Sequence, residues 1–149
     1  MEIQMAIHGI IRNDPFERGG IFMQQLSLSL LPDRLAVCRL GPNEAIPQWV
    51  FSTSFWSVTR TDEELSLILP EELVPSSWKA EKGWRCLKVL GPLDFSITGV
   101  VASLSTPLAQ AGVSILAIST YDTDYLLVRN GDVDRAKEVL IEHGHRISP

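Results

Sequence analysis

The chain has 149 residues, of which 45% are hydrophobic and 21% are charged, and its formal net charge is −5. This length supports one ordinary domain or two very small ones, with enough apolar mass for a packed core. The acidic balance excludes a general binder of nucleic acid or anionic membranes, because such partners require a basic field. No apolar run approaches the roughly 20 residues that a membrane-spanning helix needs, so we expect a soluble protein that binds neither nucleic acid nor membrane.

Residues 1–22 have no sustained hydrophobic period, and Met23 directly precedes the first clear strand pattern. We expect this segment to be a flexible leader or an over-extended gene start. It lacks the basic and then apolar pattern of a secretory signal. Cys38 and Cys86 both lie in apolar stretches, which predicts reduced, buried thiols and a cytoplasmic location.

Residues 23–80 are predicted to form a strand-rich first unit. Alternating leucines predict a strand at 26–30, and after a turn at Pro32-Asp33 a second strand is expected at 35–40. A short helix fits between residues 42 and 50, although Pro47 would truncate it. A hairpin is predicted from residue 55 to residue 69, followed by a polar connection to the second half.

Aromatic residues concentrate in the first half and at its border, at Trp49, Phe51, Phe55, Trp56, Trp78 and Trp84. Large rings can fill a core from which a helix is missing, and this is the interpretation we favour. The alternative is an exposed patch for a partner or for a second protomer.

Residues 84–149 are predicted to form a more regular second unit. Strands and helices are expected in the order β-α-β-β-α-β, at 84–90, 97–111, 113–119, 125–129, 132–143 and 145–147. Pro107 lies inside the first helical pattern, so we expect a kink there or a restart capped by Ser105 or Thr106. The order is that of a ferredoxin-like α+β unit, an antiparallel sheet with both helices on one face. The first unit gives a degenerate form of it.

The sequence offers little support for an enzyme. It contains no nucleophile elbow, phosphate-binding glycine loop or dinucleotide fingerprint. His143 and His145 could ligate a metal, but no cysteine or carboxylate cluster accompanies them, so we expect neither metal nor cofactor. Asp122 and Asp124 could form a catalytic carboxylate pair, although turn chemistry explains them better. We therefore expect no catalytic residues.

Two segments favour binding of a small zwitterion. Residues 91–96 join a strand to a helix start, where unpaired N–H groups at the positive end of the helix dipole suit a carboxylate. Asp94 is then either the helix cap or the partner of an ammonium group. Residues 119–124 form a corner that is denser in hydroxyls and carboxylates than a chain reversal requires.

Residues 87–142 resemble an ACT domain, a small-molecule regulatory module. The corner at 119–128 and the hairpin at 58–66 resemble those of bacterial tandem ACT proteins related to the cytosolic arginine sensor of animal cells. The likeness covers residues 26–144. It implies two ACT units, at 23–80 and 84–149, in an amino-acid-binding regulatory protein without catalytic activity.

The resemblance also implies a ligand site between ACT units. Because this chain holds only two units, a four-unit arrangement would require a homodimer. Asp124 would accept an amine or guanidinium, whereas Asp122 would contact the ligand or only shape the turn. The ligand-binding residues implied by the motifs are Gly91, Asp94, Thr98, Ser114, Ile115, Thr120, Tyr121, Asp122 and Asp124.

Two alternatives stay open from the sequence. The chain could be a protein–protein interaction module whose pocket is filled by its own side chains. It could also be an enzyme that depends on Asp122 and Asp124. The sequence names neither the amino acid nor a downstream protein partner.

Overall fold

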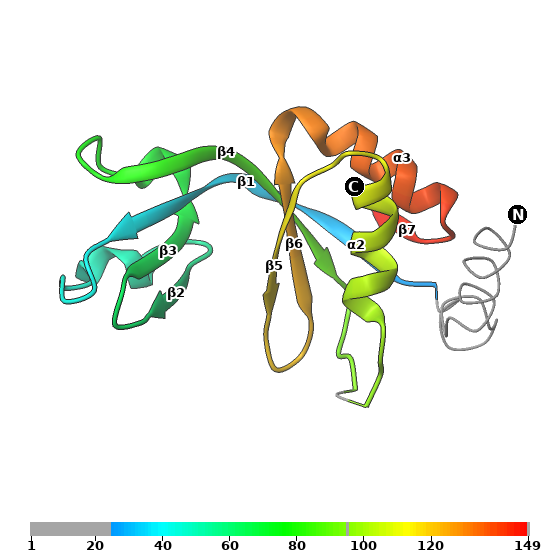
Figure 1. The fold of residues 1–149 in the computed structure, drawn as a ribbon, viewed down its shortest axis with the longest axis horizontal. Coiled ribbons are helices and arrows are strands. Elements are labelled where there is room, and N and C mark those ends of the chain that lie inside the picture. The colour runs from blue at the N-terminus through cyan, green and yellow to red at the C-terminus, as the bar shows by residue number, and fades with distance from the viewer. Residues whose placement is uncertain (1–24, 95, 149) are drawn as a thin grey trace, which may run out of the picture.

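A computed structural model describes residues 25–94 and 96–148 (Figure 1). The predicted leader at 1–22 lies outside these residues. The strands are β1 (Ser27–Leu40), β2 (Ser57–Arg60), β3 (Leu65–Pro70), β4 (Lys79–Val89), β5 (Ile115–Ser119), β6 (Asp124–Arg129) and β7 (Arg146–Ser148). The helices are α2 (Val100–Gln110), α3 (Val133–Glu142) and the 3-10 turns η1 (Gln48–Ser52), η2 (Glu71–Leu73) and η3 (Asn130–Asp132).

The strands form one seven-stranded sheet in the order β2-β3-β1-β4-β6-β5, with β7 paired to β1. Strands β1 and β4 are long and run through both halves of the molecule (Figure 1). The first part of β1 pairs with β7 and the end of β4, whereas its second part pairs with β3 and the start of β4. The two halves therefore share a continuous hydrogen-bonded sheet, and their division into two units stays a prediction.

The predicted turn at Pro32-Asp33 is wrong. Both residues lie inside β1, and the pairing of β1 with β4 shifts its register between Leu30 and Arg34. Proline has no N–H to donate, so it fits where the ladder is already interrupted. The irregularity absorbs Pro32 without ending the strand.

The predicted β-α-β-β-α-β order of the second half is confirmed, as β4-α2-β5-β6-α3-β7. Side chains alternate along β6, so Leu126 and Val128 face the helices while Tyr125 and Leu127 face the other side. Both helices pack on one face of the sheet, at the right of Figure 1. The fold is thus α+β and ferredoxin-like. Strand β1 lies between β7 and β4, an insertion that the sequence pattern did not predict.

Helix α2 runs continuously through Pro107, without the restart that was the alternative to a kink. A proline at this position removes the N–H that would bond to the carbonyl of Ser103. The Nε2 atom of His145 lies 3.4 Å from that carbonyl oxygen instead. A partner from outside the helix thus meets the carbonyl that Pro107 leaves without a helical donor.

The expectation that the aromatic rings fill the first core is only partly correct. Trp84 is buried, but Trp49, Phe51 and Trp56 are 38%, 42% and 45% exposed. The residues that fill the core of the first half are mostly aliphatic, namely Ala36, Cys38, Val50, Leu65, Leu67, Leu69 and Val74.

Within the described ranges, no helix is both long enough and apolar enough to cross a membrane.

Candidate functional site

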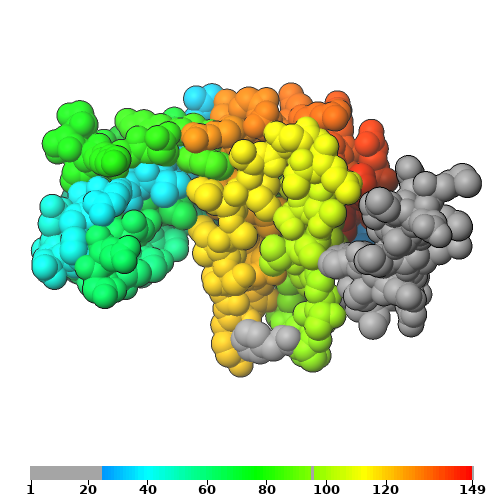
Figure 2. Space-filling view, viewed as in Figure 1, coloured from blue at the N-terminus to red at the C-terminus, as the bar shows by residue number. Residues whose placement is uncertain are grey.

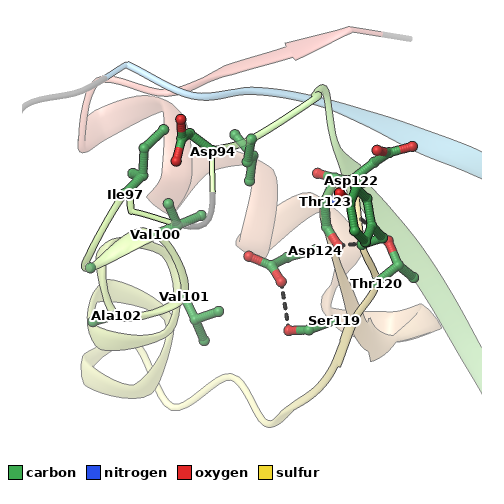
Figure 3. A pocket seen from close by; sticks show the side chains of 13 residues that line it. Asp94, Ile97, Val100, Val101, Ala102, Ser119, Thr120, Asp122, Thr123 and Asp124 are labelled. Carbon is green, nitrogen blue, oxygen red and sulfur yellow. Dashed lines mark hydrogen bonds between the residues drawn. The ribbon is translucent and has the colours of Figure 1, made fainter.

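A pocket of about 400 Å³ lies between the start of α2, the loop before it and the corner that joins β5 to β6 (Figure 3). Its volume is within the range of small-molecule sites. The described residues that line it are Leu93, Asp94, Ile97, Gly99, Val100, Val101, Ala102, Ser119, Thr120, Tyr121, Asp122, Thr123 and Asp124.

The β5–β6 corner is held rigidly by its own hydroxyl groups. The hydroxyl of Thr120 donates to the carbonyl of Thr123 at 2.9 Å and accepts from the N–H of Thr123 at 3.3 Å. The hydroxyl of Thr123, which is buried, donates to the carbonyl of Val89 at 2.6 Å. This last bond fixes the corner to the end of β4.

The carboxylate of Asp124 is also held in place. Ser119 and Asp124 are paired across the ladder, and the hydroxyl of Ser119 donates to Oδ1 of Asp124 at 2.6 Å. In Figure 3 the carboxylate of Asp124 points into the space between the corner and α2. This geometry presents an anionic acceptor to a molecule in the pocket.

The loop before α2 packs directly on the corner. The N–H of Leu93 donates to the carbonyl of Asp122 at 2.7 Å. A Cβ at Gly91 would lie 2.9 Å from that same carbonyl oxygen, so only glycine allows this approach. Gly91 therefore shapes the site, although it does not line the pocket.

Asp94 is not the helix cap. Its Oδ1 atom accepts the N–H of Ser96 at 2.8 Å, and this hydrogen bond lowers the pKa of the Asp94 carboxyl. Its backbone carbonyl accepts the N–H of Ile97 at 3.0 Å. Two of the N–H donors expected at 91–96, those of Leu93 and Ser96, are thus already hydrogen-bonded within the protein.

The available donors lie at the start of α2. Gly99 caps the helix with φ +77°, and no side chain completes the cap. The first helical bond runs from the N–H of Ser103 to the carbonyl of Gly99 at 2.8 Å. The N–H groups of residues 100–102 therefore have no acceptor one turn earlier, and all three residues line the pocket.

The lining has a clear electrostatic character. Asp94, Asp122 and Asp124 are acidic, and none of the other lining residues is Lys, Arg or His. The first turn of α2, which carries the positive end of the helix dipole, lines the same pocket. The pocket can therefore bind a cation on the corner side and a carboxylate at the helix start.

Five of the nine predicted ligand residues line the pocket: Asp94, Thr120, Tyr121, Asp122 and Asp124. Gly91 packs beside it, whereas Thr98, Ser114 and Ile115 do not line it. The remaining lining residues were not among the predicted ligand residues, namely Leu93, Ile97, Gly99, Val100, Val101, Ala102, Ser119 and Thr123. Of these, Leu93, Ser119 and Thr123 lie in the segments at 91–96 and 119–124 that the sequence singled out. Gly99, inside the helix predicted at 97–111, was the available signal for a later helix start. Within the part of the chain that the structure describes, no three His, Cys, Asp or Glu residues form a group that could hold a metal ion.

The chain matches known protein families over both halves. A family model described as an ACT domain matches residues 79–142, and another, described as an N-terminal domain, matches residues 33–77. A solved Agrobacterium tumefaciens protein is 37% identical, with a TM-score of 0.79, and the match covers 83% of this chain and 92% of that one. A Clostridium acetobutylicum aspartate kinase, 12% identical with a TM-score of 0.63 over 85% of this chain and 36% of its own, shares the fold.

Curated relatives point in the same direction. The cytosolic arginine sensor for mTORC1 subunit 1 is 38% identical over 90 residues in Bos taurus and 37% identical over 90 residues in Homo sapiens. These matches cover 53% of this chain but only 27% of the sensor, so the chain corresponds to part of the length of those relatives. The chain contains an ACT domain at residues 79–142 and is related to the cytosolic arginine sensor over part of that sensor's length.

Proposed function

We propose that this chain is a regulatory protein without catalytic activity that binds an amino acid in the pocket between α2 and the β5–β6 corner. The observation that carries the proposal is that two complementary groups line one pocket. They are the carboxylate of Asp124 and the backbone N–H groups of residues 100–102, which have no acceptor one turn earlier in the helix. An amino acid carries a cationic and an anionic group on one small frame. Each would meet its complement, the amine at the corner and the carboxylate at the helix start.

The proposed ligand is a cationic amino acid. Three aspartates and no basic side chain line the described pocket, so a second positive charge is better balanced than a second negative one. Relatives that cover about half of this chain are named as sensors of arginine. Arginine is therefore the first ligand to test.

We further propose that a homodimer completes the site at an ACT–ACT interface, with residues 23–80 and 84–149 as the two units. Strand β5 ends the sheet order, and its outer edge can face a second protomer. Ile115 begins this strand and Ser114 directly precedes it, so both lie at the opposite end of the strand from Ser119, which lines the pocket. Their proposed contact is with ligand in the partner's pocket.

The regulatory step is a shift of population. A ligand that bridges α2 and the corner favours the arrangement in which both are correctly placed, and thereby biases the dimer or a surface that binds a downstream protein. We propose a cytoplasmic location, as for the relatives that are named cytosolic.

A thermal-shift screen of the twenty amino acids tests the proposal. Selective binding to the folded state raises the melting temperature, so arginine or lysine should raise it and most others should not. Asp124→Ala should abolish this response without a large loss of fold, whereas Asp62→Ala, in the distant β2–β3 turn, should keep it. A flat screen with an intact fold would contradict the proposal and favour an interaction module.

A further inference from the structure

A second pocket, of about 330 Å³, lies between the first half of the molecule and the β5–β6 hairpin. Figure 2 shows the surface hollowed between the lobe of the first half and the column formed by β5 and β6. The lining residues come from the loop between η1 and β2, from the first residue of β2 and from the β5–β6 hairpin, namely Thr53, Ser54, Phe55, Trp56, Ser57, Ile118, Thr120 and Tyr125. A molecule in this pocket would contact both halves.

Aromatic rings form the walls of this pocket. Phe55 and Tyr125 are in edge contact, with ring centroids 5.7 Å apart and an interplanar angle of 64°. The ring of Trp56 is 45% exposed and is supported by an edge contact with Phe51 at 5.0 Å. Exposed and well-supported rings of this kind offer faces and edges on which a flat ligand can stack.

The pocket has no charged side chain among its described lining residues. This distinguishes it from the acidic pocket on the other side of the corner, with which it shares Thr120. A charged ligand would lose hydration and gain no counter-charge from the lining itself. The charges bound to lining residues are of opposite sign, Asp33 on the hydroxyl of Ser54 and Lys88 at 5.9 Å from the centroid of the Tyr125 ring. An uncharged ligand would lose little.

Hydroxyl groups of the lining residues determine which hydrogen-bonding groups a ligand of this pocket needs. The hydroxyl of Thr53 donates to the carbonyl of Val50 at 2.8 Å, and that of Ser54 donates to Oδ2 of Asp33 at 2.6 Å. The hydroxyl of Thr120 donates to the carbonyl of Thr123 at 2.9 Å. A hydroxyl that has already donated its hydrogen keeps lone pairs that accept. Three of the five lining hydroxyls are thus engaged as donors and keep lone pairs for a ligand that donates a hydrogen bond.

We propose that this pocket is a second small-molecule site, for an uncharged aromatic ring that carries an N–H or O–H donor. Bound there, such a ring stacks between the Trp56 loop and the hairpin and holds the two halves together. This site does not depend on amino-acid binding in the acidic pocket. The assignment of this second site can therefore be tested independently of the proposed function.

Indole is a suitable probe, because it combines a flat ring with one N–H donor. In the full chain, indole should shift the methyl resonances of Ile118 saturably, with a Kd of about 1 mM or tighter. The methyl resonances of Ile141, which is 54% exposed on α3, should stay in place. Absence of a saturable shift at Ile118, or an equal shift at Ile141, would overturn the proposal.

Two matched tryptophans supply the control variants. Trp56→Ala should weaken indole binding by about fivefold to tenfold, because it removes a wall of the pocket. Trp49→Ala, at a similarly exposed ring that stacks on Trp78 outside the pocket, should change it by less than about twofold. 1-Methylindole lacks the donor and should bind several-fold more weakly than indole. Equal effects of the two variants, or equal binding of the two probes, would contradict the assignment, and the wild-type methyl shifts test it even if a variant fails to fold.

Discussion

Ser119 and Asp124 face each other at the end of the β5–β6 ladder, and the Ser119 hydroxyl donates a 2.6 Å hydrogen bond to the Asp124 carboxylate. The bond sets the direction in which this acceptor points into the acidic pocket. A positioned carboxylate loses less conformational entropy when it binds a cation than a freely rotating one does.

Removal of this bond should weaken ligand binding without loss of fold. We expect Ser119→Ala to reduce the affinity for arginine by about fivefold, the scale of one charge-assisted hydrogen bond in a partly exposed site. Ser77→Ala, at an exposed turn in the first half, should have no effect. Titration calorimetry on the two variants makes the comparison, and an unchanged affinity in Ser119→Ala would show that this bond does not support the site.

Gly91 should tolerate no larger residue. In Gly91→Ala the new methyl group would meet the Asp122 carbonyl oxygen at 2.9 Å and the Leu93 nitrogen at 3.1 Å, both of which are backbone atoms. We expect a loss of about 1–2 kcal/mol in the free energy of unfolding, because backbone must shift. Gly131→Ala, where a Cβ meets nothing within 4 Å, should change it by less than about 0.5 kcal/mol. Urea denaturation of both variants provides the measurement, and equal stability would refute the close approach.

His145 should make stability depend on pH. The ring accepts the N–H of Leu26 at Nδ1, at 3.3 Å, and its Nε2 lies 3.4 Å from the carbonyl of Ser103, an arrangement that fits the neutral imidazole. Burial is the main cause that lowers the pKa of His145 from its ordinary value of 6.5, and nearby His143 lowers it further. The unfolded chain therefore binds this proton more readily than the folded chain does.

It follows that the contribution of His145 to the free energy of unfolding is fully present above pH 6.5. This contribution is lost as the pH falls through the lower pKa that His145 has in the folded state. Denaturation curves at pH 7 and pH 5 should show this loss in the wild type and in His143→Gln. The loss should be smaller in His145→Gln. An identical pH dependence in all three proteins would show that other groups control the acid response.

The two cysteines should resist thiol reagents in the folded chain. Burial raises the pKa of Cys38 to about 11 and that of Cys86 to about 12, so little thiolate is present near neutral pH. Both side chains are also almost fully inaccessible. A chromogenic disulfide reagent should label neither residue on the minute timescale at pH 8 and both after denaturation. Rapid labelling of the native protein would contradict their burial.

The sequence predicted elements where periodicity and composition agree. The apolar stretch that holds β5 and the amphipathic pattern of α3, closed by Gly144, are found close to where they were expected. The prediction failed where a distant residue decides the outcome. Pro107 is accommodated because His145 reaches Ser103 from beyond α3, and Pro32 is accommodated by an irregular register with β4.

The candidate site shows the same division. The acidic corner is a local motif, and its residues do line one pocket. The donors were expected too early in the chain, because the start of α2 at Val100 depends on the left-handed conformation of Gly99 rather than on apolar spacing. Ser119 could have been inferred from its ladder position opposite Asp124, but only once the register was known.

The most direct measurement of the central claim is a calorimetric titration of arginine into the wild-type chain, Asp124→Asn and Asp62→Asn. We predict saturable binding to the wild type, an affinity at least about tenfold weaker for Asp124→Asn because an ion pair is lost from the pocket, and an unchanged affinity for Asp62→Asn. Equal binding to all three proteins, or no binding to the folded wild type, would contradict the assignment of this pocket to a cationic amino acid.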